Sequence, residues 1–232
     1  MSNPYFRFKR FTVYHDLCAM KTGVDGVMLG AWADCQNVKN ALDVGTGSGL
    51  IALMLAQRSD AFIHTIDIDD NACKQAEINF SNSPFRNRLS IECADFKSFT
   101  SSVRYDMIVS NPPYFAHSLK SPDKNRNLAR HNDHLPLEIL FEKSASLLSP
   151  QGKAAFILPF DRWESANALA AENGLFLCRK TLVSSLQHQP PKRVLLEYSF
   201  THGFTTEDSF YIGKDKQNYS SEYKTLTEEF YL

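Results

Sequence analysis

Short apolar runs alternate with stretches of helical periodicity between residues 40 and 173. Apolar runs that end at a glycine, an acid or a proline predict buried strands, here at residues 40–44, 62–67, 89–93, 105–109 and 153–158. The stretches between them predict helices at residues 50–58, 71–81, 137–148 and 163–173. Strands that alternate with helices are typical of a parallel sheet with crossover helices on both faces, so the pattern predicts an α/β fold.

The predicted structure continues on both sides of this alternating core. A helix is predicted ahead of it at residues 24–33. Two further strands complete a sheet of seven, at residues 175–182 and 194–200. We therefore expect an N-terminal arm with a helix, a core, and a tail packed on the core by its aromatic side chains, at residues 1–39, 40–202 and 203–232. Such sheets bind ligands beyond the carboxyl ends of their strands, so the loops there are expected to carry the chemistry.

The composition of the 232 residues is that of an ordinary globular protein, with 43% hydrophobic and 22% charged residues. No run of about 18 apolar residues is present, so no membrane span is expected. The first ten residues lack the apolar core of a secretory signal, which favours a cytoplasmic protein. Five cysteines without a Cys-x-x-Cys spacing are expected to be reduced thiols. No metal site is predicted, because Cys and His do not cluster at ligand spacing.

Three alternating glycines, Gly45, Gly47 and Gly49, follow the first predicted strand and open a helix. Glycine allows a sharp turn and a close ligand approach, and the N–H groups at a helix start attract an anionic group. The second strand ends at Asp67, whose carboxylate can accept both hydroxyls of a ribose, whereas Asp69 is expected to cap the next helix. The loop differs from the dinucleotide fingerprint, because the sixth position, Leu50, is not glycine.

The third strand ends at Asp95, which is followed by Phe96. Asp95 can accept a hydrogen bond from an adenine amine, and Phe96 can cover the ring. A helix cap is the alternative role for Asp95, since aspartate is favoured at that position.

The fourth strand leads directly into the tetrad Asn111-Pro112-Pro113-Tyr114. Two prolines stiffen this segment and end the strand. The Asn111 side-chain oxygen and the Pro112 carbonyl can each accept one hydrogen of a planar amino group, which localises the nitrogen lone pair for attack on a methyl group. Tyr114 offers a ring face on which a planar substrate such as a flipped base can stack. Asn111, Pro112 and Tyr114 are therefore the predicted catalytic residues.

The series LDVGTGSG, TIDID, CADF and NPPY resembles the class I S-adenosylmethionine-dependent methyltransferases over residues 40–115. The resemblance implies a Rossmann-like sheet, mostly parallel with an antiparallel last strand. It also implies S-adenosylmethionine as the cofactor, with its methionyl part at the glycine loop, its ribose at Asp67 and its adenine at Asp95 and Phe96. Ile68 and Asn111 are also expected to face the cofactor. In that family the tetrad marks methylation of adenine N6, cytosine N4, guanine N2 or glutamine amides.

The segments outside these motifs resemble a narrower family, the bacterial valine-tRNA adenine-N6 methyltransferases, over residues 4–231. The similarity is carried by FRFKRFTV near the start, by KTGVDGVMLGAW, by ARH, and by the stretch around QPPKR. It implies methyl transfer to N6 of adenine 37, beside the anticodon of valine tRNA. Lys21 would then reach the carboxyl end of the cofactor. RNA contacts are expected at Arg7, Lys9, Arg10, Arg130, His131, Lys192 and Arg193.

The net charge of −1 argues at first against a nucleic-acid partner. The charges are unevenly distributed, however. The first 21 residues carry four bases and one acid, whereas the last thirty carry six acids and three lysines. The basic segments remain suited to phosphate contacts with tRNA. We expect a monomer without a separate RNA-binding domain.

Three alternatives stay open beside the tRNA methyltransferase. A protein-glutamine N-methyltransferase usually carries a helical N-terminal domain, and only 39 residues precede the first core strand here. A ribosomal RNA base N-methyltransferase would use the same tetrad. A non-catalytic module that binds RNA or the cofactor would not need an intact tetrad and glycine loop.

Overall fold

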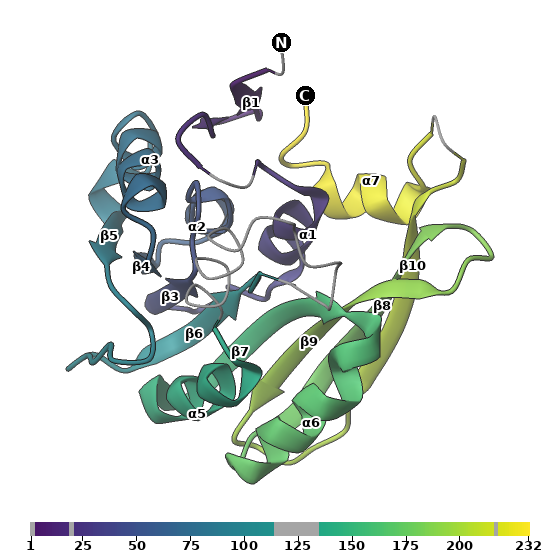
Figure 1. Cartoon of the computed structure of the whole chain (residues 1–232). Helices are drawn as coiled ribbons and strands as arrows, with labels where there is room; N and C mark the ends of the chain where they lie inside the picture. Colours follow the sequence, from purple (N-terminus) through teal and green to yellow (C-terminus); the bar gives the residue numbers. More distant parts are fainter. Residues whose placement is uncertain (1–2, 19–20, 114–134, 216–217) are drawn as a thin grey trace, which may run out of the picture.

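The protein is described by a computed structural model that covers residues 3–18, 21–113, 135–215 and 218–232. The main sheet is made of the strands β3 (Asn40–Val44), β4 (Phe62–Asp67), β5 (Leu89–Cys93), β6 (Tyr105–Ser110), β7 (Leu148–Pro159), β8 (Phe176–Leu186), β9 (Pro191–Ser199) and β10 (Thr206–Gly213). Their spatial order is β10-β8-β9-β7-β6-β3-β4-β5 (Figure 1). The predicted α/β class is confirmed.

The strand directions bring the segments that carry the sequence motifs to one side of this sheet, where the parallel strands end. The strands β5, β4, β3, β6 and β7 run parallel, and β9 is antiparallel to both β7 and β8. The strand predicted last, at residues 194–200, is β9 and is antiparallel as expected, but it is followed by a further strand, β10, which pairs in parallel with β8. Because β9 runs in the opposite direction to β7, it begins where β7 ends, and Arg193 pairs with Pro159.

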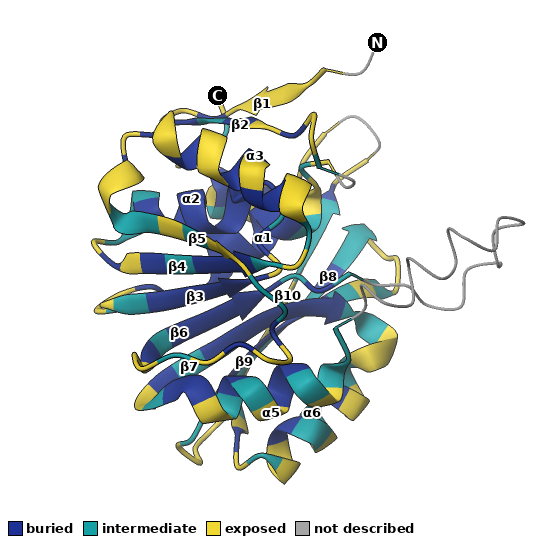
Figure 2. Cartoon of the chain, turned by 60° about the vertical axis from the view of Figure 1, so that its left-hand side comes forward, coloured by how far each residue is buried: buried dark blue, intermediate teal, exposed yellow. Residues whose placement is uncertain are grey.

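Helices cover both faces of the sheet, as Figure 2 shows. They are α1 (Val24–Trp32), α2 (Leu50–Arg58), α3 (Asp70–Ser81), α5 (Leu137–Leu147), α6 (Trp163–Glu172) and α7 (Ser221–Thr227), with two short 3₁₀ turns at Arg86–Arg88 and Phe160–Arg162. Alternate strand residues enter two separate cores. Met107 and Val109 pack with α1 and α2, whereas Ile108 between them packs with α5 and α6. Burial on both faces explains why these strands are continuous apolar runs.

The sheet has eight strands, one more than the seven predicted. The additional strand β10 comes from the C-terminal tail and pairs in parallel with β8 at the sheet edge. Its first four residues, TEDS, are exposed and polar, so they carry no strand periodicity. Charged residues of this kind are common on edge strands, where they discourage pairing with other chains.

The two ends of the chain pack against one another. Near the N-terminus a small hairpin pairs β1 (Tyr5–Arg7) with β2 (Thr12–Tyr14). The Lys9 N–H in its turn donates to the Phe230 carbonyl at 2.8 Å, and both termini lie on the same side of the molecule in Figure 1. In the described residues no helix combines the length and apolarity that a membrane crossing requires.

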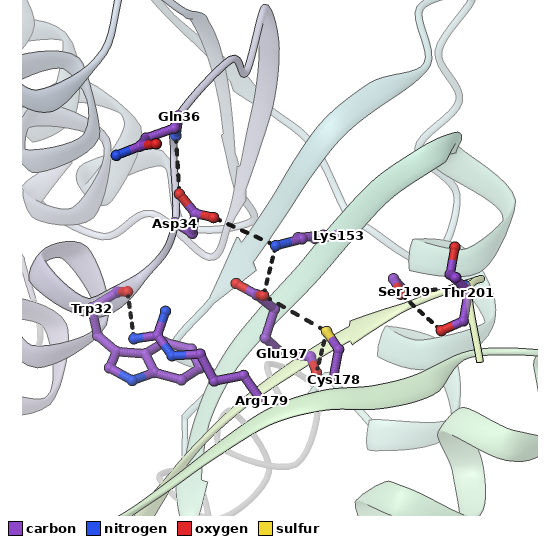
Figure 3. A network of polar contacts seen from close by, with 9 residues as sticks. All are labelled: Trp32, Asp34, Gln36, Lys153, Cys178, Arg179, Glu197, Ser199 and Thr201. Carbon is purple, nitrogen blue, oxygen red and sulfur yellow. Dashed lines mark hydrogen bonds and ion pairs between the residues drawn. The ribbon is translucent and has the colours of Figure 1, made fainter. Parts of the chain in front are cut away.

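A polar network joins the C-terminal end of α1 to β7, β8 and β9 on the side of the sheet that lies opposite the tetrad (Figure 3). Lys153 forms ion pairs with Glu197 at 3.0 Å and with Asp34 at 3.5 Å. The guanidinium carbon of Arg179 lies 3.8 Å from the centre of the Trp32 ring, and Arg179 also donates to the Trp32 carbonyl at 3.1 Å. Because Glu197 is only 3% exposed, its charge depends on Lys153 for compensation.

We predict that Lys153→Met destabilises the protein, because it leaves the buried Glu197 carboxylate without its cation. Breaking a fully buried pair costs about 3–5 kcal/mol, and we expect about 2 kcal/mol here since the pair is only partly buried. The measurement is the urea midpoint at an unchanged slope. The double variant Lys153→Met/Glu197→Leu should regain stability, and Lys97→Met is an exposed control. Equal midpoints for Lys153→Met and wild type would contradict the prediction.

Candidate active site

The glycine loop between β3 and α2 depends on left-handed backbone. Gly45, Gly47 and Gly49 have φ angles of +70°, +56° and +80°. A Cβ at Gly49 would lie 2.4 Å from the Phe80 ring, so this glycine is also required by packing. A Cβ at Gly45 or Gly47 would meet no atom within 4 Å among the described residues. At these two positions the backbone is therefore open to a ligand.

The Asp67 carboxylate at the end of β4 is built into this loop. Its Oδ2 accepts from the Gly47 N–H at 2.8 Å, and its Oδ1 accepts from the Asp69 N–H at 3.0 Å. Burial raises the pKa of Asp67, although both N–H donors oppose that shift. Sequence reasoning placed Asp67 beside the glycine loop, and the structure brings the two together. Asp69 accepts from the Asn71 N–H at 2.9 Å, which confirms its predicted role as a helix cap.

The predicted adenine residues differ in how accessible they are. Asp95 accepts from the Lys97 N–H at 2.9 Å, so it caps a turn. The alternative role of a helix cap required a helix after it, and the described residues between β5 and β6 form none. Phe96 is only 4% exposed and packs with Phe99 in the core. Ile68 is 46% exposed directly after Asp67. The accessible apolar side chain at this position is therefore Ile68.

Sequence reasoning assigned no role to Asp43, which is fully buried at the end of β3 beneath the glycine loop. Its Oδ2 accepts from the Thr46 hydroxyl at 2.7 Å, which ties the strand to the loop. Burial raises the pKa of Asp43 to about 7, although the Thr46 hydrogen bond opposes the shift. The available signal was an acid inside an apolar run, because burying a carboxylate without a partner costs free energy.

Asn79 is a second residue that sequence reasoning missed. Its buried side chain on α3 donates to the Ser48 carbonyl and to the Tyr14 carbonyl, both at 2.8 Å. It also accepts from the Tyr14 N–H at 2.9 Å. One amide thus joins the glycine loop to the N-terminal hairpin. An asparagine at helical spacing from the buried Ala72 and Ala76 was the signal that could have identified it.

The catalytic segment begins beside the glycine loop. Ser110 pairs in register with Val44, and its hydroxyl donates to the Val44 carbonyl at 2.8 Å. Asn111 therefore leaves β6 next to the position where Gly45 leaves β3. Asn111 is half-buried and Pro112 is buried. The predicted stacking residue Tyr114 lies outside the described residues.

The start of β9 brings two of the predicted RNA contacts to the same sheet edge. Lys192 is exposed there, and Arg193 follows it. The Arg193 Nε donates to the Asp25 carboxylate at 2.8 Å, which joins β9 to the first turn of α1. Arg193 therefore has a structural partner, and its contact with RNA stays a prediction.

The basic residues of the N-terminal hairpin also make internal contacts. Lys9 donates through its ammonium to the Glu228 carbonyl at 2.6 Å, and the Arg10 guanidinium lies 5.1 Å from the Phe85 ring centre. Arg7 lies exposed on β1.

Three predicted site residues remain, namely Lys21, Arg130 and His131. Lys21 is exposed just before α1, and Arg130 and His131 lie outside the described residues. Across the described part of the chain, no three His, Cys, Asp or Glu side chains are grouped so that they could hold a metal ion.

Comparison with solved structures defines the class of protein. A predicted O-methyltransferase from Agrobacterium tumefaciens superposes with a TM-score of 0.69 over 89% of this chain and 96% of that protein, at 15% identity. A ribosomal protein L11 methylase from Lactobacillus delbrueckii subsp. bulgaricus superposes with a TM-score of 0.58 over 82% of this chain and 84% of that protein, at 18% identity. Residues 28–158 match the model of the methyltransferase small domain. The fold is thus that of the class I methyltransferases.

Sequence relatives define the family more narrowly. A tRNA1(Val) (adenine(37)-N6)-methyltransferase of Parabacteroides distasonis is 48% identical over all of this chain and 99% of its own length. Proteins of the same name from Phocaeicola vulgatus and Tolumonas auensis are 49% and 41% identical over all of this chain, and over 99% and 98% of their own lengths. The chain belongs to this family of tRNA1(Val) (adenine(37)-N6)-methyltransferases, as the sequence resemblance implied.

The pKa of Asp43 predicts a pH dependence of stability. An aspartate in the unfolded chain titrates near pH 3.9, roughly three units below the folded value. As pH rises from about 4 to about 7, the unfolded chain releases a proton that the folded chain keeps, so wild-type stability falls. Asp43→Asn removes this titration and keeps an acceptor for Thr46.

Urea unfolding from pH 4 to pH 8 checks this expectation. The stability of Asp43→Asn relative to wild type should increase up to about pH 7 and then level off, with a total change on the order of 4 kcal/mol. A difference that does not vary with pH would show that the folded protein holds Asp43 ionised throughout.

Proposed function

We propose that this protein transfers a methyl group from S-adenosylmethionine to N6 of adenine 37 in valine tRNA. The observation that carries the proposal is the start of the NPPY tetrad at the end of β6, beside a left-handed glycine loop, in a chain of this family. A tRNA substrate would place the enzyme in the cytoplasm, and we propose that it acts as a monomer without a metal ion.

Two features of the site fit S-adenosylmethionine. The open backbone at Gly45 and Gly47 leaves room for the methionyl part, with Gly49 closing the loop. Each Asp67 oxygen accepts one N–H and keeps further lone-pair capacity for a ribose hydroxyl. When bound, the cofactor supplies an electrophilic methyl group on a sulfonium, which is a good leaving group.

The adenine end of the cofactor is assigned to the ends of β4 and β5. Ile68 would cover the ring, Asp95 would accept from its amine, and the buried Phe96 would support that strand end from below. Lys21 would reach the cofactor carboxylate from the segment before α1.

The chain's own contribution to transfer is positioning. Asn111 and the Pro112 carbonyl would accept the two hydrogens of the target amine, and Tyr114 would stack on the flipped base. Holding the amine in this way localises its lone pair and aligns it for attack. The ammonium formed can lose its proton afterwards, so no general base is required.

The N-terminal arm of residues 1–39 and the loops of the core, residues 40–202, would grip the RNA, whereas the tail of residues 203–232 would pack on the core. Arg7, Lys9 and Arg10 lie on the first segment. The remaining proposed contacts are Lys192 and Arg193 on β9, and Arg130 and His131.

The N-terminal segment favours this proposal over one alternative, a protein-glutamine methyltransferase. Ahead of β3 the described residues form one hairpin and the helix α1, which is unlike the helical domain of protein-glutamine methyltransferases. A ribosomal RNA substrate and a non-catalytic module remain alternatives that one assay distinguishes.

That assay incubates the protein with labelled S-adenosylmethionine and total tRNA that lacks the modification. We expect label in N6-methyladenosine of valine tRNA, located at position 37 by nuclease mapping. Ribosomal RNA and whole-cell protein are parallel substrates. Label found only in protein or in ribosomal RNA would contradict the proposal, and no transfer to any substrate would favour a binding module.

Asn111→Ala should slow transfer strongly while cofactor binding persists, because it removes one of the two acceptors for the target amine. We expect the single-turnover rate to fall by about a thousandfold, a typical loss for one preorganised polar group. Calorimetry with the cofactor supplies the binding measurement.

Two variants control for this change. Asn111→Asp keeps an acceptor oxygen and should retain measurable transfer, and Asn71→Ala alters an exposed asparagine elsewhere. Near-normal activity of Asn111→Ala would refute the proposed role.

A further inference from the structure

A cleft of about 690 Å³ lies between segments from the two ends of the chain. It is lined by residues 6–9 of the hairpin, by residues around the start of α1, and by residues of α7 and the end of the chain. We call it the terminal cleft. The residues that matter for its chemistry are Phe6, Arg7, Val24, Tyr219, Lys224 and Tyr231. Its volume falls within the usual range of ligand sites.

Aromatic side chains in this cleft remain accessible. Tyr219 is 50% exposed and Phe6 is 39% exposed. The Phe6 ring lies 5.7 Å from the Tyr231 ring in an edge-on arrangement. Exposed rings on a folded surface are the usual platforms for unstacked nucleobases, because every base has a π-face.

The charged side chains of the cleft favour an anion. Three of those that line it are cationic, namely Arg7, Lys9 and Lys224, and one, Glu228, is acidic. Lys9 already donates to the Glu228 carbonyl, so Arg7 and Lys224 are the cations best placed for an added ligand. The net charge of the final thirty residues is negative, which conceals this local cationic rim.

The cleft is joined structurally to the catalytic edge. Val24 lines the cleft, and the next residue, Asp25, pairs with Arg193 at the start of β9. One RNA molecule that follows this helix start can therefore reach both the cleft and the tetrad.

We propose that the terminal cleft binds an unpaired nucleotide of the tRNA substrate other than the target adenine. Its base would stack on Tyr219, and its phosphate would contact Arg7 and Lys224. The inference rests on the proposed function and extends it, because it assigns RNA contacts to the acidic C-terminal tail. A basic–aromatic cleft fits a nucleotide better than it fits an apolar protein partner.

The test measures binding of unmodified valine tRNA to the full chain across a range of salt concentrations. Tyr219→Ala should weaken binding at least about fivefold, the equivalent of roughly 1 kcal/mol of stacking, whereas Tyr219→Phe should bind like wild type. Lys224→Gln should reduce the salt slope by about one. Cofactor affinity and the transfer rate at saturating tRNA should not change, because these residues lie outside the transfer site.

Phe62→Ala is the matched control, since Phe62 is 63% exposed at the start of β4, at the opposite edge of the sheet. The inference is overturned if both cleft variants bind tRNA like wild type, or if Phe62→Ala weakens binding equally. It is also overturned if the cleft variants change only the oligomeric state in light scattering. Wild-type protein that methylates tRNA while the cleft variants bind normally would refute this inference alone. Wild-type protein that neither binds nor methylates tRNA would refute the proposed function as well.

Discussion

The site depends on one contact between two neighbouring strands, the hydrogen bond from the Gly47 N–H to the Asp67 carboxylate. Three alternating left-handed glycines have no regular structure of their own, and they lose more conformational entropy than other residues when they are ordered. The Asp67 carboxylate, the Ile66 carbonyl and the Thr46–Asp43 bond hold the loop in a single conformation. The same carboxylate faces the proposed ribose site. The group that would bind the cofactor therefore also shapes the loop, and a binding loop formed in this way needs little rearrangement when its ligand arrives.

The rest of the site follows from strand direction. Parallel pairing of β3 and β6 places the glycine loop and the start of the tetrad side by side, and the reversal at β9 adds Lys192 and Arg193 to the same edge. The pair Arg193–Asp25 then fixes the start of α1 against that edge. At the opposite edge, the network of Lys153, Glu197 and their neighbours holds the other end of the same helix. Helix α1 is thus fastened at both ends.

The N-terminal hairpin is connected both to the glycine loop and to the C-terminal residues. Asn79 joins the N-terminal hairpin to the glycine loop, and Lys9 joins the hairpin to the C-terminal residues. The cofactor loop, the hairpin and the tail are therefore connected through buried or backbone contacts.

The sequence by itself determined most of the core. Apolar runs that end in glycine or aspartate identified β3 to β6 and their helices, because strands buried on both faces leave an unambiguous pattern. It also identified the glycine loop, Asp67 and the tetrad, since each depends on a residue type with restricted chemistry. It could not identify β10, whose exposed polar half becomes a strand only because β8 offers a free edge. It did not show that Phe96 is buried while Ile68 is accessible, that Asp43 and Asn79 hold the loop from below, or that the two chain ends form one cleft. Those features arise from contacts between residues far apart in the chain, and local periodicity carries no information about them; only the tertiary structure decided them.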